Sequence, residues 1–310
     1  MARMFVAGDI NLDVFCTAGK LPEKHHEIHM DAVNFSIGGN AANFAVAAGL
    51  LGLDVELSCV LGNDFSTPFL LAGLERSGVK TGWLKAKGPN GCSVVILHPD
   101  GEKAIMSNKG AAAKLSAAYL RKAVLPRIRR GDVFYAGGYF HVTGLHSGMA
   151  GLLADVRKRG ATVVFDMCYD TSGRWMAGLK SCIRKIDIIF LNGVELRELT
   201  GESDREKAAR SLLRAGPREV VLKLGREGSV YFSRRGGMQI REKALKVKPV
   251  DSTGCGDVFN AGFMLARFNG LVPRECLAAG NYVAGKKCGH HGLVLPDAKS
   301  VMKYASMALL

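Results

Sequence analysis

The feature that most constrains this chain is an alternation of two kinds of segment along most of its length. Short apolar runs rich in β-branched residues predict buried strands, and stretches with helical spacing of apolar residues lie between many of them. The predicted strands are Met4–Ala7, Val55–Val60, Val94–Leu97, Val133–Ala136, Thr162–Phe165, Ile186–Leu191 and Glu219–Leu224. The predicted helices are Asn40–Leu53, Thr67–Ser77, Ser147–Arg159 and Arg205–Ala215. Because strand–helix–strand units join parallel neighbours, the pattern predicts an α/β protein with a mainly parallel sheet.

Two regions depart from this alternation. His25–Ser36 alternates polar with apolar residues, and Cys92–Ser107 reads as two strands joined by the turn Pro99-Asp100-Gly101. These strands predict a small antiparallel sheet standing off the main body. The last third of the chain is predicted to be helical, over Asp257–Phe268, Pro273–Cys288 and Asp297–Ala308.

Composition limits the class of protein. A chain of 310 residues that is 48% hydrophobic and 23% charged fits one large domain, or one domain with a small appendage. The N-terminus does not resemble an export signal, and no apolar stretch is long enough to span a bilayer. The eight cysteines are scattered without a C-x-x-C pair, which is typical of free thiols. We therefore expect a cytoplasmic protein with no membrane partner.

The net charge of +14 comes from lysine and arginine residues spread along the chain in short groups. There is no nucleic-acid recognition motif, no aromatic interleaving and no basic tail, so we expect no nucleic-acid partner. A positive field also suits an anionic substrate or a nucleotide.

The stretch DSTGCGDVFN, residues 251–260, predicts a tight turn that opens a helix. Gly254 and Gly256 permit the turn, and unpaired backbone N–H groups at a helix N-terminus form an anion site. Asp257 in the first turn has two interpretations. It caps the helix, or it takes a proton from an attacking hydroxyl group while the N–H groups hold a transferred phosphoryl group.

A second glycine-rich element, SIGGNAANFAVAAGLLG, covers residues 36–52. Gly38-Gly39 breaks the preceding strand, and the small residues that follow allow a helix to pack closely. Asn40 and Asn43 in its first turn are polar groups that packing alone does not require, which favours the functional interpretation.

Together the two elements resemble the signatures of the ribokinase-like carbohydrate kinases, the PfkB family. GGNAANFAVAAGLLG is similar to the N-terminal signature, and DSTGCGD is similar to the C-terminal form D-T-x-G-A-G-D. Both occur in the right order and near the expected ends, so the resemblance covers nearly all of the chain. It implies a three-layer fold with a mainly parallel central sheet flanked by helices and a small β-sheet lid. It also implies one kinase domain over residues 1–310, with lid strands from about 13–37 and 92–108.

The resemblance assigns the catalytic base to Asp257 and an anion hole to the backbone N–H groups of Gly254, Cys255 and Gly256. Asp251, which opens the motif, matches an acid that in many members helps to bind a monovalent cation such as K⁺ beside the hole. Cys255 replaces the usual alanine. Its backbone can still donate, so we expect no thiol chemistry there.

Substrate recognition falls on two segments of the resemblance. By the resemblance, Asn11 and Asp13 match the sugar-binding pair of the family. A carboxylate at this position can accept hydrogen bonds from two neighbouring hydroxyl groups. Gly38 and Gly39 match the hinge on which the lid closes, and Asn43 matches a ligand of a sugar hydroxyl group. Asp9, an extra acid in the same segment, either forms an Asx turn after Gly8 or contacts the substrate.

LNGVELRELTG, residues 191–201, resembles the N-x-x-E element of the family. Asn192 is then near the nucleotide phosphates, and Glu195 organises hydrated Mg²⁺. Leu191 and Gly193 replace the usual proline and acid, so the match is looser, and an exposed residue early in a helix is the alternative for Glu195.

KLGREG, residues 223–228, resembles the nucleotide-contacting turn and places Lys223, Gly225 and Gly228 near ATP. Asn281 matches the helix that borders the adenine pocket, and its alternative is a buried asparagine satisfied by backbone. FDMCYDTSGRW, residues 165–175, resembles a strand and loop that end near the active site, without a role for any one residue.

These assignments predict an ATP-dependent sugar kinase, a phosphotransferase with an alcohol group as acceptor, with ATP and Mg²⁺ as cofactors. A free sugar such as ribose or fructose is the leading acceptor, and a nucleoside, a keto-deoxy sugar acid or a sugar phosphate are the alternatives. The competing class is a non-catalytic regulator that binds a sugar or nucleotide, but it predicts decay of the base or of the anion hole, and Asp257, Gly254 and Gly256 are all present. The resemblance is also compatible with a homodimer formed through the lid.

Overall fold

The computed structural model describes residues 2–20, 24–97, 103–290 and 292–309. Within these ranges the larger sheet has nine strands in the order β13-β12-β11-β10-β9-β8-β1-β4-β5. The β11–β12 and β12–β13 pairs are antiparallel and the other pairs are parallel. The strands are β1 (Met4–Gly8), β4 (Val55–Leu61), β5 (Lys80–Lys85), β8 (Val133–Gly137), β9 (Thr162–Asp166), β10 (Ile188–Asn192), β11 (Glu219–Lys223), β12 (Ser229–Ser233) and β13 (Gln239–Glu242).

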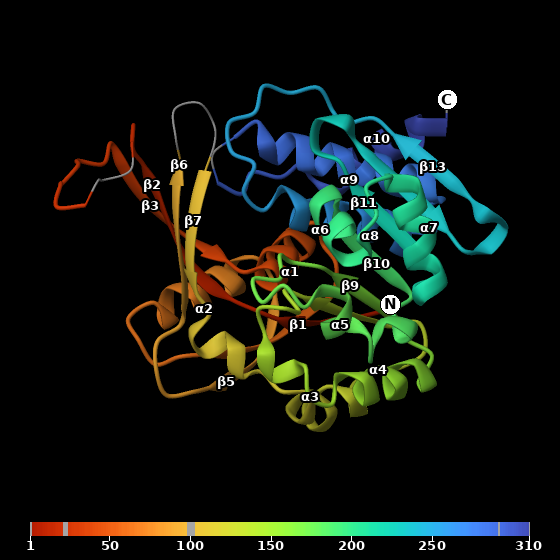
Figure 1. Cartoon of the computed structure of the whole chain (residues 1–310), viewed down its shortest axis with the longest axis horizontal. Coiled ribbons are helices and arrows are strands. Elements are labelled where there is room, and N and C mark those ends of the chain that lie inside the picture. The colour runs from red at the N-terminus through yellow and green to blue at the C-terminus, as the bar shows by residue number, and fades with distance from the viewer. Residues whose placement is uncertain (1, 21–23, 98–102, 291, 310) are drawn as a thin grey trace.

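Helices cover both faces of this sheet (Figure 1). One face is covered by α1 (Asn40–Leu50), α2 (Thr67–Arg76), α8 (Cys255–Phe268), α9 (Pro273–Cys288) and α10 (Ala298–Ser306). The other is covered by α3 (Ala117–Ala123), α4 (Met149–Lys158), α5 (Trp175–Leu179), α6 (Gly193–Thr200) and α7 (Arg205–Ala215). Short 3₁₀ helices lie at Gly110–Lys114, Leu125–Arg127, Thr143–Leu145, Ile183–Lys185, Gly225–Glu227, Arg235–Gly237 and Met307–Leu309.

The strand side chains alternate between two hydrophobic cores. Phe5 and Ala7 of β1 pack into the core under α3 to α7, whereas Met4 and Val6 pack into the core under α1 and α8 to α10. Because both faces are covered, the central strands are apolar at nearly every position, which is why the sequence shows continuous apolar runs. The predicted α/β fold with a mainly parallel sheet is confirmed.

A four-stranded small sheet stands to one side of the main body (Figure 1, red to yellow strands). Its order is β3-β2-β6-β7, and the outer pairs are antiparallel as predicted. The central β2–β6 pair is parallel, because both strands leave the main body at the same edge, where Asn11 pairs with Gly91. The strands are β2 (Asn11–Thr17), β3 (Ala32–Gly38), β6 (Gly91–Leu97) and β7 (Lys103–Asn108).

Several predicted boundaries differ from the structure. The strand predicted from His25 begins at Ala32, because β2 ends at Thr17, directly opposite Ala32, and leaves the preceding residues without a partner strand. The predicted turn Pro99-Asp100-Gly101 lies outside the described residues. The strands β5, β12 and β13 were missed. The first is half exposed and the last is polar, as edge strands are, so neither has a continuous apolar run.

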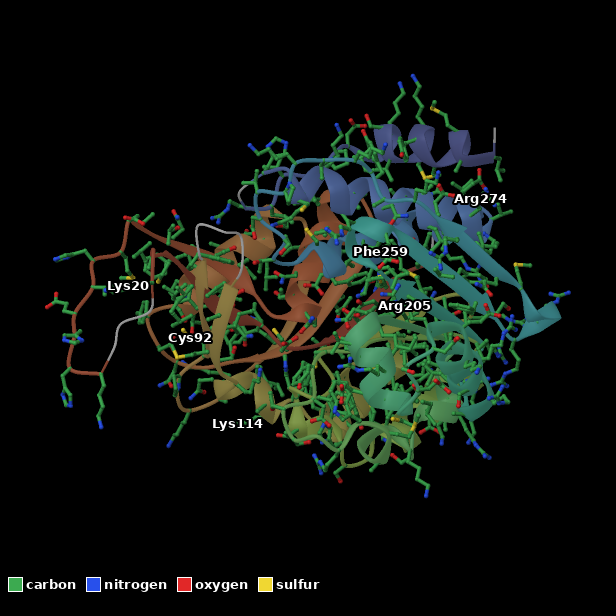
Figure 2. All side chains as sticks on the ribbon, turned by 45° about the horizontal axis from the view of Figure 1, so that its top comes forward. Lys20, Cys92, Lys114, Arg205, Phe259 and Arg274 are labelled. Atoms are coloured by element: carbon green, nitrogen blue, oxygen red, sulfur yellow. The ribbon has the colours of Figure 1, made fainter. Side chains whose placement is uncertain are left out.

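Basic side chains are spread over the surface of the molecule. Lys20, Lys114, Arg205 and Arg274 are exposed and lie over different parts of the molecule, while Phe259 is buried (Figure 2). No helix in the described part of the chain is long and apolar enough to cross a membrane.

Candidate active site

Polar side chains gather at the carboxyl edge of the parallel sheet. Asp166, Asn192 and Lys223 are the last residues of β9, β10 and β11, and the register pairs Asn192 with Lys223. Ligands of open parallel sheets bind outside this edge. Asp166 and the other strand-end residues are therefore placed by the fold where chemistry is expected.

The N-terminus of α8 faces the same region. Gly254 is the N-cap with φ 71°, a left-handed conformation that favours glycine, and no side chain caps the helix. The amide of Cys255 donates to the carbonyl of Ser252 at 3.2 Å. An anion bound to the first turn would therefore compete with the Ser252 carbonyl for the Cys255 amide. Gly254 and Gly256 have no side chains that would block an anion from reaching this turn.

Asp257 links the two glycine-rich motifs. Its carboxylate is buried and accepts hydrogen bonds from Asn43 at 3.0 Å and from Asn40 at 3.3 Å, both in the first turn of α1. The N-cap of α8 is Gly254, so Asp257 does not cap its own helix. Burial, and next the charge of Asp166, hold the pKa of Asp257 well above its usual range, opposed by Lys223 and Asn43.

Lys223 lies at the centre of the site. Its ammonium is 3.0 Å from Oδ1 of Asp166, and a Cβ built on Gly256 would lie 3.3 Å from Nζ. Burial alone lowers the pKa of Lys223, but the charges of Asp166, Glu195 and Asp257 outweigh it and raise the pKa. The sequence assigned Lys223 to the nucleotide turn, and the structure places its ammonium against the turn that carries the base.

Sequence reasoning missed Asp166. Its side chain is 1% exposed, and no described residue partners its Oδ2 atom. It directly follows the predicted strand Thr162–Phe165 and lies in the segment 165–175, to which the sequence analysis gave no residue role, so the rule that sites lie at carboxyl ends was the signal available for finding it.

Asn192 and Glu195 bond to each other. The Asn192 amide donates to Oε2 of Glu195 at 2.8 Å, and the Glu195 amide donates to Oδ1 of Asn192 at 2.9 Å, which is a capping box at the start of α6. Glu195 is buried, so the alternative of an exposed helical residue is wrong. Burial raises the pKa of Glu195 to about 7, opposed by Lys223.

Asn11 and Asp13 extend from β2 at the other end of the site. Both side chains are buried, and no described residue partners the Oδ1 atom of either one. Burial raises the pKa of Asp13 to about 7, opposed by a hydrogen bond from Ser93. A Cβ on Gly38 would lie 2.0 Å from Cγ of Asp13, so only glycine lets β3 pass this carboxylate. Unpartnered oxygens at a cavity are suited to accepting hydroxyl groups.

Asp9 has a different environment from Asp13. Its Oδ1 accepts from the Ala41 amide at 3.0 Å, and its Oδ2 lies 3.3 Å from Nδ1 of His141. Burial raises the pKa of Asp9, but the contacts to His141 and Ala41 outweigh it and lower the pKa. Asp9 thus anchors the start of α1, beside Gly39 with φ 96°, which supports a local structural role over substrate contact.

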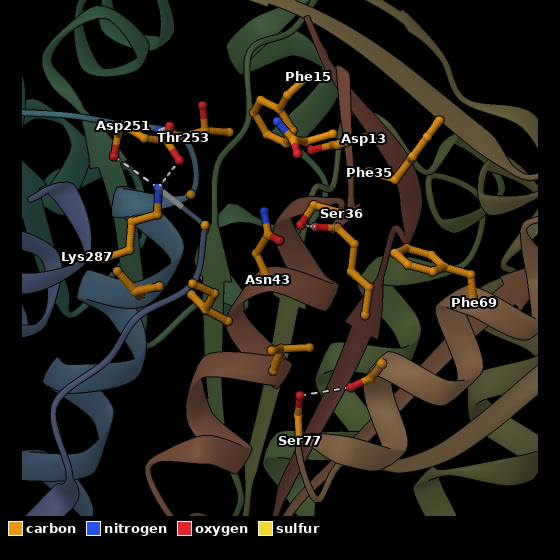
Figure 3. A pocket seen from close by; sticks show the side chains of 18 of the residues that line it. Asp13, Phe15, Phe35, Ser36, Asn43, Phe69, Ser77, Asp251, Thr253 and Lys287 are labelled. Carbon is orange, nitrogen blue, oxygen red and sulfur yellow. Dashed lines mark hydrogen bonds and ion pairs between the residues drawn. The ribbon is translucent and has the colours of Figure 1, made fainter. Parts of the chain in front are cut away.

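A cavity of about 920 Å³ is lined by Asp13 at one side and by the Asp251–Gly254 loop at the other, next to Asp257. Asn43 stands in its middle, with Asp13, Phe15 and Phe69 on one side and Asp251 and Lys287 on the other (Figure 3). The lining residues are Asp13, Phe15, Thr17, Ala32, Asn34, Phe35, Ser36, Ile37, Asn43, Val46, Leu50, Phe69, Gly73, Arg76, Ser77, Asp251, Thr253, Gly254, Val258, Lys287, Gly292 and Leu293.

None of the predicted nucleotide residues, Asn192, Lys223, Gly225, Gly228 and Asn281, lines this cavity. Gly225 and Gly228 have φ 56° and 94°, and a Cβ on Gly228 would lie 2.1 Å from the Glu242 carbonyl oxygen, so the turn requires glycine. Asn281 donates to the carbonyls of Glu242 and Lys243 at 3.3 and 3.1 Å, which matches its structural alternative.

Cys255 and Asp251 complete the loop before α8. The Cys255 thiol contacts the carbonyls of Asp251 and Ala284 at 3.7 Å, and burial raises its pKa to about 12, so little thiolate forms. Asp251 pairs with the buried Lys287, a residue that the sequence did not single out.

Comparison with known proteins gives one family. The sequence profile described as pfkB family carbohydrate kinase matches residues 1–299. The chain is 26% identical to ribokinase of Arabidopsis thaliana, covering 99% of this chain and 82% of that protein. It is 28% identical to 1-phosphofructokinase of Haloferax volcanii, covering 88% and 86%. The structure of Arabidopsis thaliana ribokinase complexed with ribose and ATP superposes with a TM-score of 0.79 at 24% identity, covering 98% and 99% of the two chains.

Proposed function

The chain belongs to the pfkB family of carbohydrate kinases, and we propose that it transfers the γ-phosphoryl group of ATP to a hydroxyl group of a small carbohydrate. As a family member it is a phosphotransferase with an alcohol group as acceptor. The observation that carries the proposal is the position of Asp257. A buried carboxylate lies in the first turn of α8, held by Asn40 and Asn43, beside a cavity that also contains Asp13.

In the proposed reaction the acceptor hydroxyl oxygen attacks the γ-phosphorus of ATP. The new O–P bond forms, the bond from phosphorus to the ADP oxygen breaks, and the hydroxyl proton passes to Asp257. Its raised pKa suits this role, since a carboxylate with a pKa nearer the operating pH is the stronger base. The amides of the Gly254–Gly256 turn and the ammonium of Lys223 stabilise charge on the transferred group.

ATP and Mg²⁺ fit the residues present. Oδ2 of Asp166, which no described residue partners, and the carboxylate of the buried Glu195 are hard oxygen donors of the kind that Mg²⁺ prefers; Asp166 ends β9, and Glu195 lies in the first turn of α6, directly after the neighbouring strand β10. In the described part of the chain no group of three acidic, cysteine or histidine side chains forms a metal cage, so Glu195 is expected to act through water. When bound, Mg²⁺ neutralises phosphate charge. The Asn192 turn and the glycines of the Gly225–Gly228 turn are the proposed nucleotide contacts.

A free sugar is the first proposed acceptor. Asn11 and Asp13 offer unpartnered oxygens for its hydroxyl groups, and Asn43 lies between them and the base. Because β2 and β3 carry one wall of the cavity, closure of the small sheet about Gly38 and Gly39 would exclude water from the reaction.

A nucleoside is the second proposed acceptor, because one end of the cavity is apolar. Phe15, Val46, Leu50 and Phe69 line it, and Phe69 is 39% exposed. A volume of about 920 Å³ leaves room beyond a single sugar ring, and an aromatic base is suited to such a wall. A keto-deoxy sugar acid or a sugar phosphate would instead need a cation at this end, where Arg76 is the available group.

ADP release from ATP and Mg²⁺ tests the proposal across free sugars, nucleosides, sugar acids and sugar phosphates. We expect turnover with one class, and a loss in kcat on the order of a hundredfold or more for Asp257→Asn with little change in acceptor binding. Ser77→Ala, at the far end of the cavity, is the matched control. Near-normal turnover in Asp257→Asn rejects that residue as the base. Silence across the panel with ATP still bound favours a non-catalytic regulator.

An apolar row on the face of the small sheet opposite to Asp13 supports a homodimer, although Phe35 in this row also borders the cavity. The register places Phe35, Val14, Val94 and Met106 in one row across the four strands. Phe35 is 59% and Met106 63% exposed, and two such apolar rows would cover each other in a symmetric pair.

Light scattering measures this directly. We expect a particle of twice the 33.2 kDa chain mass, and a monomer for Phe35→Asp. Ile105→Asp is the control, since Ile105 is also exposed but faces the other side of the sheet. A wild-type monomer at all concentrations contradicts the dimer.

A further inference from the structure

The side chain of Lys287 binds the loop that precedes the proposed anion hole. It extends from the last turn of α9, is 3% exposed, and its ammonium bonds to both the carboxylate and the main-chain carbonyl of Asp251 (Figure 3). The contact to the carbonyl measures 3.0 Å. The other carboxylate oxygen of Asp251 accepts from the Thr253 amide at 2.9 Å. All the oxygens of Asp251 are therefore engaged within the chain.

A monovalent cation beside Asp251 needs the same kind of ligands, namely a carboxylate and several carbonyl oxygens. The neighbouring carbonyls are engaged as well. That of Cys288 accepts the amides of Val250 and Asp251 at 2.8 and 3.2 Å, and that of Ala284 is contacted by the thiol of Cys255. A second positive charge at this point would also be repelled by the Lys287 ammonium. The residues present do not fit a bound K⁺.

We infer that the ammonium of Lys287 takes the place of a monovalent cation, so that the kinase works without K⁺. This inference rests on the proposed function, because the loop it holds leads into Gly254 and the base. Lys287 is a positioning residue. Its positive charge is covalently attached to α9. It therefore holds residues 251–254 in place without a dissolved cation, whatever the salt concentration. The pKa of Asp251 agrees, since burial raises it but Lys287 and Thr253 together outweigh burial and lower it.

The first test is the response of the wild-type protein to K⁺. Turnover is measured with 0 to 200 mM KCl replacing tetramethylammonium chloride at constant ionic strength, on the order of physiological concentration. We expect kcat/KM to change by less than about twofold, because the charge is already in place. Saturable activation of about tenfold or more by K⁺ overturns the inference.

The second test uses Lys287→Met, with Lys286→Met as the matched control. Lys286 is exposed on the same turn of α9 and makes its cation–π contact with Tyr282, so the control removes the same charge outside the site. We expect Lys287→Met to lose about tenfold or more in kcat and to recover part of it with K⁺ but not with tetramethylammonium. Lys286→Met should behave as wild type. A Lys287→Met protein with wild-type activity overturns the inference.

Thermal unfolding supplies a readout that needs no substrate. K⁺ should raise the Tm of Lys287→Met and leave that of the wild type unchanged, since only the variant has room for the ion. A K⁺-dependent Tm in the wild type contradicts the inference even if the variant does not fold. The Tm shifts need no catalytic activity. A protein without kinase activity in any salt would therefore contradict the proposed function, whereas the Tm shifts test the role of Lys287 independently.

Discussion

Two buried lysine–aspartate pairs flank the first turn of α8, and they differ in how many acids surround the lysine. Lys287 has one carboxylate, that of Asp251, and a carbonyl. Lys223 bonds to Asp166 and also faces Glu195 and Asp257. In the first pair the two charges cancel and every oxygen of Asp251 has a partner. In the second pair there are more carboxyl groups than one ammonium neutralises. An excess of carboxyl groups is typical of a site that awaits a cation, so chemistry belongs to the Lys223 side and positioning to the Lys287 side.

Of the substitutions at these two pairs, Lys223→Met should cause the largest loss of activity. Because its ammonium lies beside Gly256 and the base, we expect kcat to fall on the order of a hundredfold to a thousandfold, with a smaller change in KM for the acceptor. Steady-state kinetics measures both, and Lys287→Met in the same assay is the comparison. If Lys223→Met lowers kcat less than Lys287→Met does, or changes only KM, then Lys223 is not the lysine that takes part in the chemistry.

The fold was predictable because its signals are local. Continuous apolar runs such as Ile188–Leu191 arise from strands buried on both faces, and Gly39 and Gly254 mark turns with a positive φ that glycine adopts without strain. The parallel pairing of β2 with β6 was not predictable, since it depends on where two distant strands leave the main sheet.

The site was predictable where a motif carries it, and not where tertiary pairing does. Asp257 and Asn43 lie in glycine-rich motifs, and the structure brings them within 3.0 Å. Lys287 sits in an ordinary helical segment, and nothing in its neighbours indicates that its ammonium reaches Asp251 across 36 positions of sequence. Asp166 is intermediate, because only its place at the end of a strand marks it.

The last expected effect concerns the pH dependence of stability through Glu195. Its pKa in the folded protein is about 7, against an ordinary value of 4.5 for glutamate, so between these values the folded state binds more protons than the unfolded state. The stabilisation from protonated Glu195 is fully present below about 4.5 and is lost as pH rises towards 7. Relative to Glu195→Gln, whose side chain can still accept from the Asn192 amide, the free energy of unfolding should fall on the order of 3 kcal/mol across this window.

Urea unfolding from pH 4.5 to 9 measures this difference in the free energy of unfolding. The same measurement on the two lysine variants tests which lysine acts on the pKa of Glu195. The charge of Lys223 lowers the pKa of Glu195, so Lys223→Met should move the upper end of the window to higher pH. Lys287→Met should leave it unchanged, because Lys287 pairs with Asp251, and the charges that shift the pKa of Glu195 are those of Lys223 and Asp166. Equal shifts in both variants would mean that the two lysines share one electrostatic network, and the division between a chemical pair and a positioning pair would then fail.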